Sequence, residues 1–102
     1  MTNVKIFGAG SIGNHLAYGC RSQGWGVTIA DTDSNALSRT RNDIYPERYG
    51  EWDEGIVLEV AEGAPSASGC DLAIIGTPPD STVAFAKSLL ENNPPRVILI
   101  EK

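Results

Sequence analysis

Five short apolar runs, separated by polar or helix-like stretches, constrain the fold of this chain more than any other feature. The last two runs, 72–75 and 97–100, contain only apolar residues and do not alternate with polar ones. Continuous apolar strands with helices between them are typical of a parallel sheet that is covered on both faces. Because parallel crossovers are right-handed, we predict an α/β fold: a doubly wound parallel sheet of strand order 3-2-1-4-5 that stops after its fifth strand.

The expected elements follow the apolar pattern and its interruptions. Strands are predicted at 4–7, 27–30, 56–60, 72–75 and 97–100. Helices are predicted at 12–23, at about 33–40, and from an N-cap at Asp80 or Ser81 to the stop at 92–95. Between 41 and 55, charges mix with Tyr-Pro and Tyr-Gly pairs, so we expect a loop with one short helical turn at most, and 63–69 is an expected linker.

Size and charge exclude several classes of protein. The 102 residues suffice for one domain. Thirteen acidic residues against eight basic ones give a net charge of −5, which argues against binding to nucleic acids or anionic membranes. With no long apolar run and no secretion signal at the start, we expect a cytoplasmic protein. Cys20 and Cys70 lie fifty positions apart outside any metal-binding spacing, so neither a metal site nor a disulfide is expected.

A glycine-rich segment joins the first predicted strand to the first predicted helix. Its residues have the spacing G-x-G-x-x-G: Gly8, Ala9, Gly10, Ser11, Ile12 and Gly13. Gly8 permits a tight turn, Gly10 lets the backbone approach a pyrophosphate, and Gly13 lets helix and strand pack closely. The first amides of the helix and its dipole then attract phosphate groups. In this strand-loop-helix context, the spacing predicts dinucleotide binding rather than an ordinary surface turn.

An acidic residue stands where a dinucleotide site needs one. Asp31 ends the second predicted strand, 18 residues after Gly13. Its carboxylate is expected to accept both hydroxyls of the adenosine ribose and to repel a 2′-phosphate, which favours NAD over NADP. Arg39 and Arg41 would weaken that preference if they folded back toward the ribose.

The predicted topology also places the rest of the site. Strands one and four are neighbours with connections on opposite faces, and ligands of such sheets lie in the crevice at their carboxyl ends. After the fourth strand come Thr77, Pro78 and Pro79, a stiff turn suited to form a wall against the nicotinamide half. Glu101 and Lys102 follow the fifth strand, where a lysine would be placed to exchange a proton with a substrate oxygen.

Three segments together resemble the nucleotide-binding half of the Gfo/Idh/MocA oxidoreductases, the glucose–fructose oxidoreductase and inositol dehydrogenase family. They are the glycine segment at 8–13, Asp-Leu-Ala-Ile-Ile-Gly-Thr-Pro-Pro-Asp-Ser at 71–81, and Val-Ile-Leu-Ile-Glu-Lys at 97–102. The resemblance implies NAD(P)-dependent oxidation or reduction of a sugar, cyclitol or nucleotide-sugar hydroxyl or carbonyl. It also implies that Lys102 helps to bind and protonate the substrate.

The chain departs from that family in two ways. Thr82 and Val83 stand where members often carry a histidine, and the family continues into a second, sheet-rich domain that holds the substrate and usually mediates assembly. We therefore expect residues 1–102 to form the NAD(P)-binding domain of a longer two-domain enzyme. This domain is expected to be inactive alone, and the resemblance implies a homo-oligomer formed through the second domain. A natural truncation is the alternative.

Other interpretations stay open at this stage. A non-catalytic module that senses NAD or another nucleotide has a similar glycine loop and acidic residue. Other Rossmann oxidoreductases, such as those like prephenate dehydrogenase, and a scaffold that retains only an interaction surface are further alternatives. His15 suits either a place near the cofactor or the surface of the helix. Trp25, Tyr45, Tyr49 and Trp52 suit either a partner surface or local packing.

Overall fold

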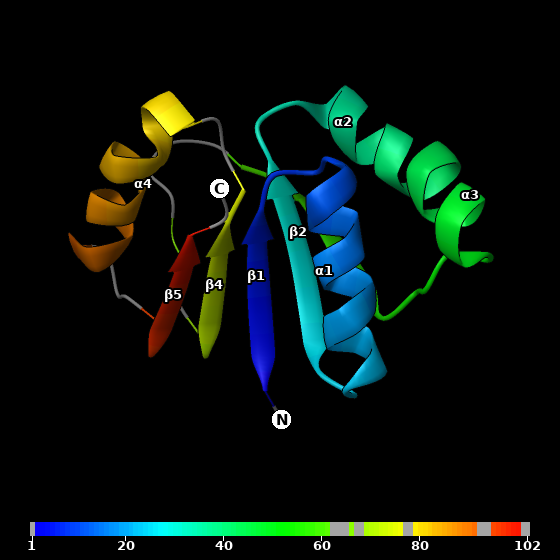
Figure 1. The fold of residues 1–102 in the computed structure, drawn as a ribbon, viewed down its shortest axis with the longest axis horizontal. Helices are drawn as coiled ribbons and strands as arrows, with labels where there is room; N and C mark the ends of the chain where they lie inside the picture. The colour runs from blue at the N-terminus through cyan, green and yellow to red at the C-terminus, as the bar shows by residue number, and fades with distance from the viewer. Residues whose placement is uncertain (1, 62–65, 67–68, 77–78, 92–94, 101–102) are drawn as a thin grey trace.

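The computed structural model describes residues 2–61, 66, 69–76, 79–91 and 95–100. Its five strands form one parallel sheet in the order β3-β2-β1-β4-β5, as predicted (Figure 1). The strands are β1 (Asn3–Phe7), β2 (Gly26–Asp31), β3 (Ile56–Val60), β4 (Leu72–Ile75) and β5 (Val97–Ile100). Their positions agree with the apolar runs to within one residue at each end.

The central strand β1 pairs with both β2 and β4. Val4 lies beside Val27 on one side and beside Leu72 on the other, and Phe7 lies beside Ala30 and Ile75. The carboxyl ends of β1 and β4 are therefore adjacent, and the connections that leave them go to opposite faces of the sheet. This is the crevice that the predicted topology requires.

Helices cover the two faces of the sheet unequally. Helix α1 (Ser11–Ser22) packs on β1 and β2, and α4 (Pro79–Glu91) packs beside β4 (Figure 1). Ile74 belongs to the core under α1, whereas its neighbours Ala73 and Ile75 belong to the core under α4. Because successive strand side chains point to opposite faces, α1 and α4 lie on opposite sides of the sheet.

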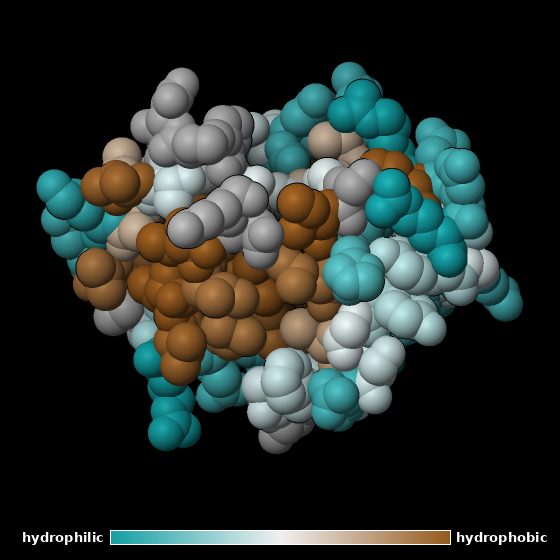
Figure 2. Space-filling model, in the orientation of Figure 1, coloured by the Kyte–Doolittle hydropathy of each residue, from teal (hydrophilic) through white to brown (hydrophobic). Residues whose placement is uncertain are grey.

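The prediction that both sheet faces are fully covered is wrong for β5. Val97 and Leu99 lie beside Leu72 and Ile74 on the α1 face, yet they are 57% and 46% exposed. Figure 2 shows a hydrophobic surface over this part of the molecule. The apolar run at 97–100 therefore predicts the strand correctly, but its side chains are less buried than the run suggests.

The predicted loop at 41–55 is wrong over its first half, which is helical. Helix α2 (Ser34–Arg39) continues into a π-helical turn, η1 (Thr40–Ile44), and then into α3 (Tyr45–Tyr49), with Asp33 as N-cap of α2. Pro46 was interpreted as a turn residue, but it stands in the first turn of α3, where a missing N–H is harmless. Likewise α4 begins at Pro79, so Asp80 and Ser81 lie inside its first turn and are not its N-cap.

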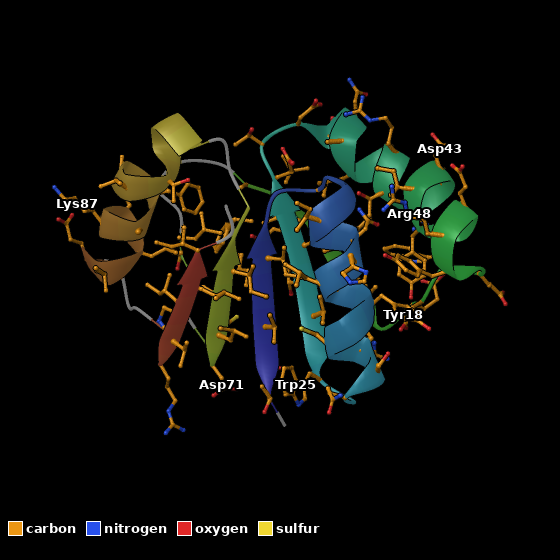
Figure 3. The ribbon with its side chains drawn as sticks, viewed as in Figure 1. Tyr18, Trp25, Asp43, Arg48, Asp71 and Lys87 are labelled. Atoms are coloured by element: carbon orange, nitrogen blue, oxygen red, sulfur yellow. The ribbon has the colours of Figure 1, made fainter. Side chains whose placement is uncertain are left out.

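An aromatic cluster holds α3 against α1. The rings of Tyr18 and Tyr49 are stacked with centroids 4.4 Å apart, and Tyr45 meets Tyr49 and Trp52 edge-on at 5.1 Å. Figure 3 shows Tyr18 between these helices, and Trp25 far from them at the amino end of the sheet. Local packing thus accounts for Tyr45, Tyr49 and Trp52, and Trp25 also packs against the main core.

Candidate dinucleotide-binding site

The loop between β1 and α1 lies at the carboxyl edge of the sheet and contains three glycines with different constraints. Gly8 has φ +119°, and a Cβ there would lie 2.8 Å from the carbonyl oxygen of Gly76. A Cβ on Gly13 would overlap the carbonyl oxygen of Gly8. Both positions therefore need glycine for the fold itself, as the spacing predicted for the turn and for close packing.

Gly10 is different, because none of the described residues requires a glycine there. Its φ and ψ are −90° and −171°, which any residue adopts, and no heavy atom of the described residues beyond its chain neighbours lies within 4 Å of where its Cβ would be. The glycine thus keeps a space open on the outside of the loop. That space is where the spacing predicts a pyrophosphate to approach the backbone.

Unpaired backbone amides accompany that space. Helix α1 begins at Ser11 with Gly10 as N-cap, and no side chain caps it. The first helical hydrogen bond runs from the Asn14 amide to the Gly10 carbonyl, at 3.0 Å. The amides of Ser11, Ile12 and Gly13 therefore have no carbonyl within the helix to bond, which makes this helix end suited to an anion. The side chain of Ser11 lies outside the described part of the structure.

Asp31 adjoins the loop, as predicted, and both of its carboxylate oxygens accept hydrogen bonds. One accepts from the Ala9 amide and the other from the Asp33 amide, each at 2.9 Å. A carboxylate oxygen can accept more than one bond, so the side chain keeps acceptor capacity for a hydroxyl. Asp31 therefore fixes the loop as well as facing the place where a ribose is expected.

A cavity of about 240 Å³ opens beside the loop. It is lined by the ends of β1, β2 and β4, the residues after β3, and α4: Phe7, Gly8, Ala9, Gly10, Ala30, Asp31, Thr32, Ala61, Gly76 and Phe85. Its walls are mainly apolar, with Asp31 as their one charged residue, and among the described lining residues none is basic. An anionic group there would depend on backbone amides and the α1 dipole.

The predicted residues of the nicotinamide side fall mostly outside the described residues. These are Thr77, Pro78, Glu101 and Lys102, whereas Pro79 is described only as the first residue of α4. Gly76, just before them, donates its amide to the Phe7 carbonyl at 2.8 Å and lies against Gly8. The end of β4 is therefore next to the glycine loop.

Sequence reasoning missed two buried polar residues behind the loop. Asn14 on α1 and Thr40 on η1 are both 0% exposed and hydrogen bonded to each other. Ala61 and Phe85 were also missed as cavity walls, because no motif marks them. The sequence offered one signal for this pair, an Asn directly after the last glycine on the buried face of the helix. The helical pattern did not indicate which residue would form a hydrogen bond with it.

The remaining titratable candidates lie outside the cavity. His15 Nδ1 lies 3.2 Å from the Tyr49 hydroxyl on the exposed side of α1, which favours the surface interpretation. Burial raises the pKa of the Cys20 and Cys70 thiols above their ordinary values, so neither is an activated nucleophile.

Among the described residues, no cluster of three or more His, Cys, Asp or Glu could hold a metal ion. No described helix is long and apolar enough to cross a bilayer.

Comparisons with known proteins give structural matches only. No protein-family model and no curated protein matches the chain. A solved structure described as a diketoreductase matches with a TM-score of 0.63 and 21% identity over 97% of this chain and 40% of that one. A putative F420-dependent NADP-reductase from Arthrobacter sp. FB24 matches with a TM-score of 0.58 and 26% identity, over 83% of this chain and 37% of that one. YjhP from E. coli matches with a TM-score of 0.57 and 20% identity, over 91% of this chain and 38% of that one.

These likenesses define the class of fold. The chain is a Rossmann-like α/β domain, similar in structure to parts of chains described as reductases. It spans about two fifths of the length of the solved chains it matches. None of these three structures is described as a Gfo/Idh/MocA oxidoreductase, so the comparisons show the fold and do not show that family.

Proposed function

We propose that this chain binds NAD(H) as the cofactor domain of an NAD-dependent oxidoreductase. The observation that carries the proposal is the open space at Gly10, next to the amides of Ser11, Ile12 and Gly13, which have no carbonyl to bond within α1. None of the described residues requires a glycine at that point, whereas a diphosphate seated on those amides needs one. When bound, the nicotinamide ring would supply the hydride acceptor or donor.

Asp31 supports NAD over NADP. Its carboxylate lines the cavity, and a 2′-phosphate on the ribose would meet that negative charge. Arg41, which would weaken the preference if it folded back, instead lies 3.5 Å from Glu54. Arg39 is exposed and is not among the residues that line the cavity.

For the substrate, we propose a sugar, cyclitol or nucleotide-sugar hydroxyl or carbonyl, held by a further domain. This rests on the sequence resemblance of 71–81 and 97–102, in which Lys102 exchanges a proton with the substrate oxygen and Glu101 and the Thr77-Pro78-Pro79 turn line the nicotinamide side. A lysine at the end of β5 would be on the same carboxyl edge of the sheet as the glycine loop.

The substitution Gly10→Ala tests the proposal without disturbing the fold. The new methyl group meets no atom in the described part of the structure but occupies the space proposed for the diphosphate, so the affinity for NADH should fall by about tenfold or more. NADH fluorescence titration measures the affinity, and thermal unfolding checks that the variant is folded.

The matched control is Gly19→Ala, a glycine in α1 whose added methyl group also meets no protein atom. It should leave the NADH affinity unchanged and raise stability by about 0.5–1 kcal/mol, the usual effect of this change within a helix. Equal NADH affinity in wild type and Gly10→Ala would contradict the proposed place of the diphosphate. An absence of binding by the wild type would contradict the proposed function.

A further inference from the structure

Two polar side chains next to the glycine loop are completely buried. Asn14 comes from α1 and Thr40 from η1, 26 residues apart in sequence, and both are 0% exposed. Neither lines the cavity. Buried polar groups of this kind lower stability unless their hydrogen bonds are complete.

Their hydrogen bonds go to the loop. The Asn14 Nδ2 amide donates to the Gly10 carbonyl at 2.9 Å and to the Thr40 hydroxyl at 3.1 Å. The Thr40 hydroxyl donates to the Ala9 carbonyl at 3.0 Å. Two successive loop carbonyls are thus held toward the protein interior by side chains from two different helices.

Holding those carbonyls inward fixes the amides that follow them. In a planar trans peptide, the C=O of one residue and the N–H of the next point in opposite directions. With the Ala9 and Gly10 carbonyls bonded to the buried pair, the amides of Gly10 and Ser11 must point outward from it. These are the first amides that an anion at the helix end would meet.

Thr40 stands where α2 ends and the π-helical turn begins. Its amide bonds to the Ala36 carbonyl of α2, and its carbonyl accepts from the Tyr45 amide, five residues further on. Thr40 is buried under the loop and Tyr45 in the main core.

The arrangement leaves one bond unmade. The Asn14 Oδ1 atom is buried and has no hydrogen-bond partner among the described residues. Turning the amide over would place that oxygen against the Gly10 carbonyl oxygen, so the unmatched acceptor accompanies the bond to the loop. A pair kept for stability alone would be better replaced by apolar residues, which points to a role in the loop.

We propose that Asn14 and Thr40 are positioning residues, which hold the glycine loop in the conformation that presents the Gly10 and Ser11 amides to a diphosphate. This inference rests on the proposed function for the identity of the ligand. The orientation of the loop itself does not depend on that function and is tested separately below.

The test compares Thr40→Val, which keeps the shape but removes the hydroxyl, with Thr40→Ser, which keeps the hydroxyl. Thr40→Val should weaken NADH binding by about tenfold and leave adenosine, which has no phosphate, within about twofold. Thr40→Ser, which keeps the hydroxyl, should bind NADH with the affinity of the wild type. The control Thr28→Val removes a hydroxyl from β2, away from the loop, and should change neither affinity.

A second measurement reads the loop without any ligand. In amide-resolved NMR of the free protein, Thr40→Val should shift or broaden the Gly10 and Ser11 amide signals, whereas Thr28→Val should leave them unchanged. Unperturbed loop amides in Thr40→Val overturn the proposal, whether or not NADH binds. An equal loss of NADH affinity and adenosine affinity in Thr40→Val overturns the proposal too, because it indicates general destabilisation. If the wild type binds no NADH but the loop amides respond as expected, the positioning role stands and the proposed function fails.

Discussion

At the scale of single residues, Asp31 serves the loop and the expected ribose with the same carboxylate. One oxygen holds the Ala9 amide and the other holds the Asp33 amide. A substitution at this position therefore acts on the shape of the loop as well as on the charge in the cavity. Asparagine retains one acceptor oxygen and a similar size, so it separates these effects better than alanine does.

Asp31→Asn should raise the affinity for NADPH relative to that for NADH by about tenfold, because the charge that repels a 2′-phosphate is removed. The absolute affinity for NADH should fall, since one amide of the pair Ala9 and Asp33 loses its acceptor. Paired titrations with the two nucleotides measure the ratio.

Asp33→Asn is the matched control for charge. Asp33 is the N-cap of α2 and accepts from the Asn35 amide at 2.9 Å, a role that asparagine fills equally well. Its NADPH to NADH ratio should stay close to that of the wild type. If both variants change the NADPH to NADH affinity ratio equally, Asp31 does not set the preference for NAD through contact with the ribose.

The residue-scale predictions succeeded where a motif states its own geometry. The spacing of Gly8, Gly10 and Gly13, with Asp31 at the end of the next strand, predicted a loop that the structure contains. Asn14 and Thr40 could not be predicted, because their contact joins two helical segments 26 residues apart and no sequence motif marks either residue.

At the scale of elements, the segment between α3 and β3 is connected back to α1 by an ion pair. The Arg21 Nε atom lies 2.9 Å from Asp53 Oδ2, and each side chain is 28% exposed. Arg21 also donates to the Trp25 carbonyl, and the Gly55 amide donates to Asp53. The end of α1 is thereby joined to the segment that leads into β3.

This ion pair predicts a contribution to stability that depends on pH. The hydrogen bond from Arg21 holds the pKa of the Asp53 carboxyl below its ordinary value of 3.8. A carboxyl whose folded pKa is lowered stabilises the fold fully above the ordinary pKa, and the contribution is lost as pH falls through the folded pKa. Asp53→Asn should therefore be less stable than the wild type by about 0.5–1 kcal/mol at neutral pH.

Urea unfolding of both proteins at about pH 7 and about pH 2.5 measures this contribution. The difference in free energy of unfolding should shrink at the lower pH, where the wild-type carboxyl is becoming protonated. A difference that is constant with pH would show that the asparagine acts through packing and not through the lost charge.

Helices and strands were predictable where aliphatic residues followed a regular pattern. They were not predictable where aromatic residues formed the buried face. The five strands were marked by aliphatic runs bounded by glycine or polar residues. The run from 40 to 49 buries Thr40 and Tyr45 at a spacing of five, which matches neither a helix nor a strand pattern, and Pro46 and Gly50 imitate turn signals. Tyr45 and Tyr49 pack against Tyr18 on α1, a contact that the local sequence pattern does not reveal.

At the scale of the whole molecule, the order of the strands brings the glycine loop and the residues that line the cavity to one edge of the sheet. The loop after β1, Asp31 at the end of β2, Ala61 after β3 and Gly76 after β4 all meet at the same cavity. Strand order was predictable because right-handed crossovers leave few alternatives for five parallel strands. The exposure of Val97 and Leu99 was not, because apolar content does not reveal whether a strand has a covering element.

The most direct test of the account is an amide-resolved NMR titration of the wild-type protein with NAD. We expect saturable shifts up to about millimolar nucleotide, centred on the amides of Gly10, Ser11, Ile12 and Gly13 and extending to Asp31. Amides at the amino end of the sheet, such as those of Trp25 and Asp71, should stay unchanged (Figure 3). No shifts up to that concentration, or shifts confined to another part of the molecule, would contradict the proposal that the glycine loop binds a dinucleotide.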